Sequence, residues 1–289
     1  MGQNIKSIFL KLQKKQGAIY QFNFSDLSQL RGIIQGTNKT EQIPFILGTS
    51  EGESRYLGLR LAVSVVKAIK KEIKNPVFLN LDHGKSFDYI KKAINSGYKM
   101  VHFDGSGLSL GENIKLTKKI VDFAHKRGIF VEGEIGYLRG ESRIYKGGVQ
   151  IKSSDMTKPN EAFEFVRKTN VDSLAIVVGN IHGIYTKNHP RLDIERIKEI
   201  KNKLGSRVFL VLHGGSGIPN KELKEAIRAG IVKININTEI RVAWREAFEK
   251  SLKFHRDEVA PYKIIQPLVI NNIAKIVEKK IKILKTSIN

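Results

Sequence analysis

The chain has 289 residues, of which 41% are hydrophobic and none is cysteine. This apolar content is enough for a large packed core and excludes global disorder, and the lack of cysteine excludes disulfides, thiolate metal sites and a cysteine nucleophile. The formal net charge of +22 favours anionic partners, but 36 of the 50 basic residues are lysines spread along the whole chain, without zinc-finger or RNA-recognition motifs. We therefore expect no specific nucleic-acid binding.

No apolar run reaches the roughly 20 residues of a membrane span and no signal peptide is recognisable, so we expect a cytoplasmic protein without membrane contact.

Short runs of β-forming residues alternate with longer amphipathic segments, a pattern typical of parallel βα units. The expected strands lie at about 18–23, 44–49, 76–82, 99–104, 129–135, 173–179, 207–213 and 232–237. The expected helices lie at 54–73, 86–96, 112–127, 160–169, 193–204, 220–229, 238–256 and 266–284. Eight strands with helical crossovers predict an α/β fold, a (β/α)₈ TIM barrel with extra C-terminal helices, as one domain over residues 1–289.

Three of the seven histidines are followed directly by glycine, and each lies at or just past the end of a predicted strand: His83, His182 and His213. The carboxyl ends of barrel strands meet at one mouth, so these imidazoles predict a divalent-metal site there, most naturally for zinc. The alternative is that they only form hydrogen bonds at the mouth. The other four lie mid-strand, on a helix or in loops and are interpreted as structural or solvent-exposed: His102, His125, His189 and His255.

Carboxylates lie at the same level of the predicted strands. Asp82 precedes His83, Asp104 ends strand four, and Glu132 and Glu134 share one face of strand five. Such groups are costly inside a barrel unless they are ligated or paired. No basic residue alternates with them on these strands, so a metal explains them better than salt bridges do. Asp82 and His83 point to opposite faces of a regular strand, so one of them must lie in a turn.

The segments after strands seven and eight predict a phosphate site. His213-Gly214-Gly215-Ser216-Gly217 frees backbone N–H groups to form an anion nest, and Asn235-Ile236-Asn237-Thr238 supplies amides and a hydroxyl. The segment 136–158 after strand five is unusually long and rich in glycine, which is typical of a lid, although a disordered insertion has the same composition.

Taken together, the ordered motifs LDHG (81–84), FDGS (103–106), EGEIG (132–136), GN-x-HG-x-Y (179–185), LHGGSG (212–217) and KININTE (233–239) resemble the class II, metal-dependent fructose- and tagatose-bisphosphate aldolases. The resemblance implies catalytic Zn²⁺, and a second divalent or a monovalent cation as an additional ion. It also implies a sugar bisphosphate substrate, dihydroxyacetone phosphate as a product, and a homodimer or homotetramer. The implied zinc ligands are His83, His182 and His213, with Glu134 and Asp104 as an additional or alternative position.

The same resemblance implies roles for further residues. Asp82 would be the acid/base at the C4 hydroxyl, and Asn235 would stabilise the developing charge. The phosphate of dihydroxyacetone phosphate would lie against Gly183, Gly214, Gly215, Ser216, Asn235, Ile236, Asn237 and Thr238, with Asn23 and Ser50 as further polar groups on the substrate side. A Schiff-base mechanism would need a lysine, for which Lys233 is the obvious strand candidate, but the three histidines argue against it.

One segment departs from the family pattern. The family's lid usually carries Gly-Gly-x-Glu-Asp, whose Glu moves the proton at C3, whereas here Ser142 stands at the Glu position and Arg143 at the Asp position. Glu141 would replace the base after a one-residue shift. The alternatives to a fructose- or tagatose-bisphosphate aldolase are a diverged aldolase-like protein with altered substrate or weak activity, and a basic protein that binds nucleic acid or a membrane surface on an aldolase barrel.

Overall fold

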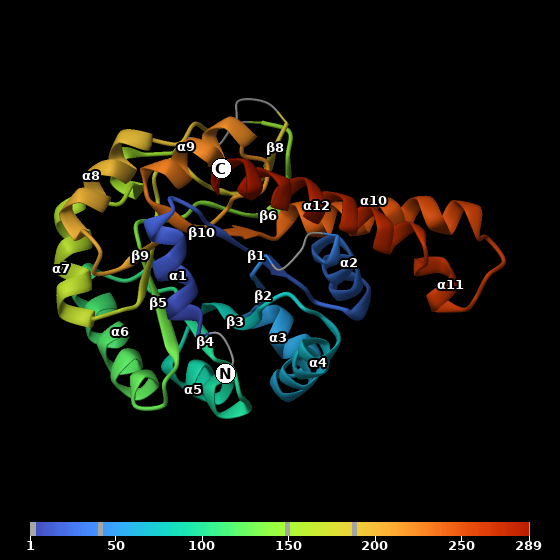
Figure 1. The fold of residues 1–289 in the computed structure, drawn as a ribbon, viewed down its shortest axis with the longest axis horizontal. Helices are drawn as coiled ribbons and strands as arrows, with labels where there is room; N and C mark the ends of the chain where they lie inside the picture. The colour runs from blue at the N-terminus through green and yellow to red at the C-terminus, as the bar shows by residue number, and fades with distance from the viewer. Residues whose placement is uncertain (1–3, 40–42, 148–150, 187–189, 289) are drawn as a thin grey trace.

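The computed structural model describes residues 4–39, 43–147, 151–186 and 190–288, so His189 and positions 148–150 of the predicted lid lie outside the described residues. Eight parallel strands close into a barrel in the order β1–β10–β9–β7–β5–β4–β3–β2 (Figure 1). The predicted (β/α)₈ barrel is confirmed. Its strands are β1 (Ile19–Asn23), β2 (Phe45–Ser50), β3 (Val77–Gly84), β4 (Met100–Phe103), β5 (Phe130–Ile135), β7 (Ser173–Ile176), β9 (Phe209–Leu212) and β10 (Ile231–Ile236).

Helices cover the outside of the barrel. They are α2 (Leu27–Asn38), α3 (Glu51–Leu57), α4 (Leu59–Glu72), α5 (Phe87–Ser96), α6 (Leu110–His125), α7 (Pro159–Thr169), α8 (Ile194–Leu204), α9 (Asn220–Ala229), α10 (Thr238–Phe254), α11 (Pro261–Ile265) and α12 (Leu268–Ile288). The single helix predicted at 54–73 is wrong in one respect. Gly58 adopts φ 86°, a conformation that favours glycine, and divides this segment into α3 and α4.

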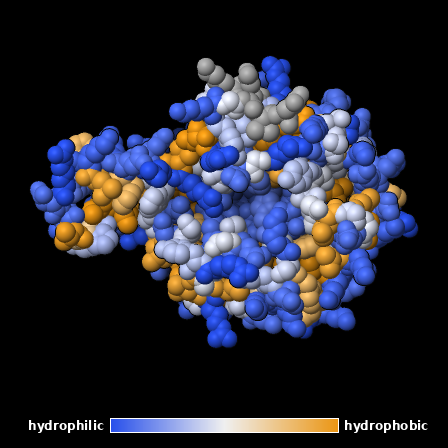
Figure 2. All heavy atoms as spheres, turned by 180° about the vertical axis from the view of Figure 1, so that it is seen from behind, coloured by the Kyte–Doolittle hydropathy of each residue, from blue (hydrophilic) through white to orange (hydrophobic). Residues whose placement is uncertain are grey.

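An N-terminal helix, α1 (Ile5–Lys14), closes the end of the barrel that faces the viewer in Figure 1. Its apolar face packs on inward-facing strand residues, and the ring of Phe9 lies 5.2 Å from those of both Phe130 and Phe209. Because apolar side chains fill this end of the barrel, we expect the polar functional groups at the opposite end. Figure 2 shows that end from outside as a hollow lined by hydrophilic residues.

The last helix, α12, packs against α2 and α10. Two glycines of α2 permit the close approach, because a Cβ at Gly32 would lie 2.6 Å from the Ile273 side chain and one at Gly36 would lie 2.7 Å from the Ala274 carbonyl. The apolar face of α12 is therefore used within the chain, with Ile273, Val277 and Ile281 fully buried. Among the described residues, no helix is long and apolar enough to cross a membrane.

Candidate active site

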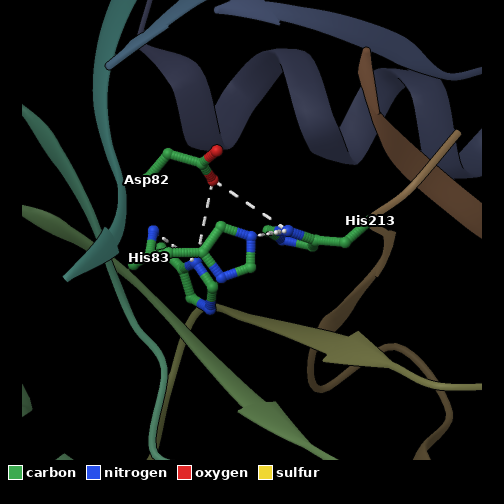
Figure 3. Close-up of side chains that lie close together, drawn as sticks. Asp82, His83 and His213 are labelled. Carbon is green, nitrogen blue, oxygen red and sulfur yellow. Dashed lines mark hydrogen bonds and ion pairs between the residues drawn. The ribbon is translucent and has the colours of Figure 1, made fainter. Parts of the chain in front are cut away.

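The end of β3 places two consecutive residues in the barrel mouth. His83 has φ 48°, and the pairing of β3 with β4 shifts register between Leu81 and Gly84. The backbone N–H of His83 donates to Nδ1 of His102 at 3.0 Å. This irregularity turns both Asp82 and His83 toward the mouth, which meets the requirement that one of them leave the regular strand (Figure 3).

Of the three histidines followed by glycine, His83 and His213 belong to one group of possible metal ligands, and the ring of His182 lies beside them. Nε2 of His83 lies 2.9 Å from Nδ1 of His213, and the ring centroids of His83 and His182 are 5.0 Å apart. Nε2 of His213 contacts Oε1 of Glu132 at 2.7 Å, which leaves Nδ1 facing the mouth. Burial, with the neighbouring His83 and His213, lowers the pKa of His182 to about 3. A neutral imidazole is the form that binds a metal.

His102 lies within the histidine and carboxylate cluster, although its mid-strand position in the sequence predicts a structural or solvent-exposed residue. It is fully buried, its Nε2 lies 3.0 Å from Oε2 of Glu134, and its Nδ1 lies 3.8 Å from Oδ1 of Asp82. Because β4 has only four residues, His102 stands one residue from its end and reaches the level of the mouth. A strand position alone does not reveal this, because the length of a strand is the least certain part of its prediction.

The carboxylates divide into two sets. Oδ2 of Asp104 lies 3.0 Å and Oε2 of Glu134 lies 3.6 Å from Nδ1 of His83, so these three form a second possible ligand group. Glu132 instead accepts from Nζ of Lys233 at 2.8 Å. The expectation that a metal explains these carboxylates better than salt bridges do is therefore wrong for Glu132, because Lys233 reaches it from β10, three strands away around the barrel. It is also wrong for Asp104, whose Oδ2 accepts from Nζ of Lys85 at 2.5 Å.

Lys233 is fully buried inside the barrel. Although burial raises the pKa of Glu132, the charge of Lys233 and the contact with His213 outweigh it and hold this pKa well below its usual value. The lysine is thus an ion-pair partner that supports the Glu132–His213 contact, which agrees with the rejection of a Schiff-base role.

Asp82 is held by two amides. Oδ2 accepts from Nδ2 of Asn23 at 2.9 Å, and Oδ1 accepts from Nδ2 of Asn235 at 3.0 Å. Although burial raises the pKa of Asp82, the neighbouring His83 and His102 outweigh it and hold this pKa well below its usual value. The group at the centre of the cavity wall is therefore an ionised carboxylate with a fixed orientation.

Glu53 links several of the predicted residues, and the sequence analysis missed it. Its Oε2 accepts from Nδ2 of Asn23 at 3.1 Å and from the backbone N–H of Ser50 at 2.6 Å. Its Oε1 accepts from Nδ2 of Asn237 at 3.2 Å and from Nη2 of Arg241 at 2.6 Å. The signal was present, because Ser50 and Glu53 have the spacing of a helix capping box directly after a strand.

A cavity of about 280 Å³ opens at this mouth. It is lined by Ser50, Asp82, His83, Glu141, Ser142, His182, His213, Gly214, Ser216, Asn235, Asn237, Thr238 and Arg241. Four of the predicted phosphate- or substrate-side residues are not among them. Asn23 lies behind Asp82, Ile236 belongs to the apolar core, and Gly183 and Gly215 lie next to the wall.

The glycine loop after β9 packs closely against its neighbours in a conformation that favours glycine. Gly214 has φ 63°, and a Cβ there would lie 2.2 Å from the carbonyl oxygen of Ile181. The N–H of Gly215 donates to the carbonyl of Asn235 at 3.0 Å, which holds the loop against β10. Ser216 and Thr238, the first residue of α10, then face the same cavity.

The predicted lid contains a strand. Within 136–158, β6 (Gly140–Tyr145) pairs in parallel with β8 (His182–Tyr185) beside the barrel. The rings of Tyr145 and Tyr185 stack with centroids 4.6 Å apart. The described part of this segment is therefore an ordered cover.

The cover turns Ser142 inward, and Oγ1 of Thr238 donates to its Oγ at 3.2 Å. Glu141 is the adjacent residue of β6; its side chain is 77% exposed, and its Oε2 lies 3.8 Å from Nε of Arg143. Both residues line the cavity opening. The role of Glu141 stays a prediction.

A family model described as fructose-bisphosphate aldolase class-II matches residues 3–288. The chain belongs to this family. A probable fructose-bisphosphate aldolase of Bacillus subtilis is 38% identical to the chain over 263 residues and covers 89% of each sequence. The fructose-bisphosphate aldolase of Geobacillus stearothermophilus is 36% identical, covering 91% of this chain and 90% of its own. The structure of the YdjI aldolase from Escherichia coli K12 is similar with a TM-score of 0.83 at 31% identity, over 99% of this chain and 98% of its own.

Membership in the class II aldolases makes the chain a lyase of a metal-dependent family. The residues present fit a metal ion. Asp82, His83, His102 and His213 each offer one ligand atom within 4.8 Å of the others, and His83, Asp104 and Glu134 form a second such group. Imidazole nitrogens and carboxylate oxygens are both ligands that divalent transition metals accept, so the chemistry of these groups is compatible with a metal ion.

Proposed function

We propose that this class II aldolase reversibly cleaves a ketose 1,6-bisphosphate, of the fructose or tagatose configuration, to dihydroxyacetone phosphate and glyceraldehyde 3-phosphate with zinc as its metal. The observation that carries the proposal is that one cavity is lined by His83, His182 and His213, by the ionised Asp82, and by Gly214 and Ser216 of the glycine loop. Metal, acid/base and phosphate site are the three parts that this aldol cleavage needs.

The metal would be held by His83, His182 and His213, with Asp104 and Glu134 as the second position for a divalent or monovalent cation. Zinc bound there supplies a Lewis acid that stabilises the negative charge developing at the C2 oxygen of the substrate. His213 is oriented for this by Glu132, whose other oxygen is neutralised by Lys233.

Asp82 acts on the bond that breaks. In cleavage its carboxylate accepts the proton of the C4 hydroxyl, the C3–C4 bond breaks to form the aldehyde, and the electron pair stays on the C3 fragment. Asn23 and Asn235 keep the carboxylate in place, and we assign to the Asn235 amide a hydrogen bond to the charge on that fragment.

C3 then receives a proton, and we assign that transfer to Glu141 of the cover. Its carboxylate lies at the opening of the cavity and has few contacts to break, so a small shift of β6 would bring it inward. The two phosphates of the substrate would occupy different parts of the cavity. One lies against Gly214, Ser216 and Thr238, and the other pairs with Arg241, the one permanently cationic side chain among the described residues that line the cavity.

The second candidate is an aldolase of the same family with another phosphorylated ketose as its substrate. The observation that favours it is Ser142, which occupies the position of the family's glutamate and contacts Thr238 instead of offering a base. The alternative of a basic protein that binds nucleic acid or a membrane surface has no comparable support, because the cavity keeps the side chains for metal binding, acid/base chemistry and phosphate binding. Homo-oligomer formation and a cytoplasmic location stay predictions.

Cleavage of fructose 1,6-bisphosphate and tagatose 1,6-bisphosphate, each coupled to the detection of dihydroxyacetone phosphate, tests the proposal. Turnover of either supports it. If both are inert while a different phosphorylated ketose is cleaved, the second candidate holds. A protein that holds zinc and cleaves no phosphorylated ketose contradicts both.

A further inference from the structure

A buried ion pair lies directly behind the phosphate loop. Nζ of Lys280, on α12, contacts Oε1 of Glu239, on α10, at 2.6 Å, and their side chains are 5% and 16% exposed. Neither residue lines the cavity. Burying both charges is costly, so the pair calls for a reason beyond the packing of two helices.

Glu239 is tied to the phosphate loop by two hydrogen bonds. Its Oε1 accepts from the backbone N–H of Gly217 at 2.7 Å, and its own backbone N–H donates to Oγ of Ser216 at 3.2 Å. Because that Oγ already accepts a hydrogen bond, the Ser216 hydroxyl proton is free to point into the cavity as a donor. Glu239 therefore fixes both the backbone and the side chain of the loop.

A carboxylate so close to an anion site works against binding unless its charge is balanced. Buried surroundings screen the charge of Glu239 poorly. One sign of this burial is the nearby hydroxyl of Tyr20, which has no hydrogen-bond partner in the described chain. Burial and the charge of Glu239 raise the pKa of Tyr20. Lys280 supplies the balancing charge from the other side, so the anion meets a neutral pair instead of a free carboxylate.

We propose that Lys280 and Glu239 are positioning residues for the phosphate site, with Glu239 holding the Ser216–Gly217 loop and Lys280 cancelling the repulsion between Glu239 and a bound phosphate. The inference rests on the proposed function only in its choice of the Gly214–Ser216 loop as the phosphate site.

The test measures two quantities on the full chain: the Kd of inorganic phosphate, and KM and kcat for whichever bisphosphate is cleaved. In Lys280→Met the uncompensated carboxylate should raise Kd and KM about tenfold or more, with kcat changed by less than about threefold. Lys280→Arg should keep the wild-type values. Lys279→Met is the matched control, because it removes the same charge from an exposed position of the same helix.

The double variant Glu239→Gln/Lys280→Met distinguishes charge balance from simple packing. The Gln carbonyl still accepts from Gly217, and both charges are gone, so most of the phosphate affinity should return. Thermal unfolding of each variant shows whether it is folded. If Lys280→Met is unfolded, the phosphate affinities of Lys280→Arg and of the double variant are compared with that of the wild type instead.

The inference is overturned if Lys280→Met binds phosphate as Lys279→Met does, if the double variant is no better than Lys280→Met, or if the wild type binds no phosphate. A wild type that binds phosphate with this dependence but cleaves no phosphorylated ketose would refute the proposed function alone. Turnover with unchanged phosphate binding in Lys280→Met would refute this inference alone.

Discussion

His213 connects the histidine cluster at the mouth to the interior of the barrel. One ring nitrogen faces His83, and the other contacts Glu132, which Lys233 neutralises. Its surroundings therefore fix both the tautomer and the direction of the ring, which is the arrangement expected of a metal-binding imidazole.

Replacing His213 should release the metal. In His213→Ala we expect zinc to fall well below the roughly one ion per chain of the wild type. Turnover should drop more than about 10²-fold, because changing even the residues around metal ligands costs 10–100-fold. Metal analysis and the cleavage assay check this, with the exposed His255→Ala as the control. Full zinc and activity in His213→Ala would show that the site is assigned wrongly.

Ser216 offers a separate test of the phosphate nest. Ser216→Ala removes one hydroxyl donor to a charged group and should weaken the binding of dihydroxyacetone phosphate by roughly 1–3 kcal/mol, while zinc content stays unchanged. Calorimetric titration measures the affinity. Ser206→Ala, an exposed serine, should bind like the wild type. An unchanged affinity in Ser216→Ala would place the phosphate elsewhere.

At the scale of elements, the cover formed by β6 and β8 decides how the proton reaches C3. Neighbouring residues of a strand face opposite sides, so with Ser142 directed at Thr238 the adjacent Glu141 is turned to solvent. Catalysis by Glu141 therefore requires β6 to shift relative to the barrel.

If Glu141 is the base, Glu141→Ala should slow the exchange of the C3 proton of dihydroxyacetone phosphate with solvent by about 10²–10⁴-fold, and zinc content should not change. Ser142→Ala should have little effect, because a hydroxyl is a poor base. NMR measures the rate of this proton exchange in both variants. Normal exchange in Glu141→Ala, with faster exchange in Ser142→Glu, would mean that the native enzyme lacks this base.

The sequence predicted elements better than it predicted their boundaries. All eight barrel strands were recognisable, because each is a short apolar run between amphipathic segments. The division of 54–73 at Gly58 was missed, because an isolated glycine in a helical pattern does not reveal its φ. The helix α1 was also missed, although the spacing of Ile5, Ile8, Phe9 and Leu12 is that of an amphipathic helix.

At the scale of the whole molecule, the site residues found from the sequence are those at or just past the ends of predicted strands, such as His83, His182 and His213. The missed ones reach the site across the barrel or from another helix. Lys233 pairs with Glu132 only because the strand order brings β10 and β5 to the same barrel interior, and Lys280 reaches Glu239 only because α12 packs on α10. Contacts that depend on closure and helix packing have no local sequence signal.

In the proposed function, a metal at the histidine cluster enables aldol cleavage in this barrel. The most direct measurement strips the purified wild-type protein of metal with a chelator and follows the cleavage of fructose 1,6-bisphosphate and tagatose 1,6-bisphosphate as Zn²⁺ is added back. We predict that the stripped protein is inactive, and that activity on one or both sugars rises in proportion to zinc until about one ion is bound per chain. Activity that persists in the metal-free protein, or zinc binding that restores none, would contradict the account.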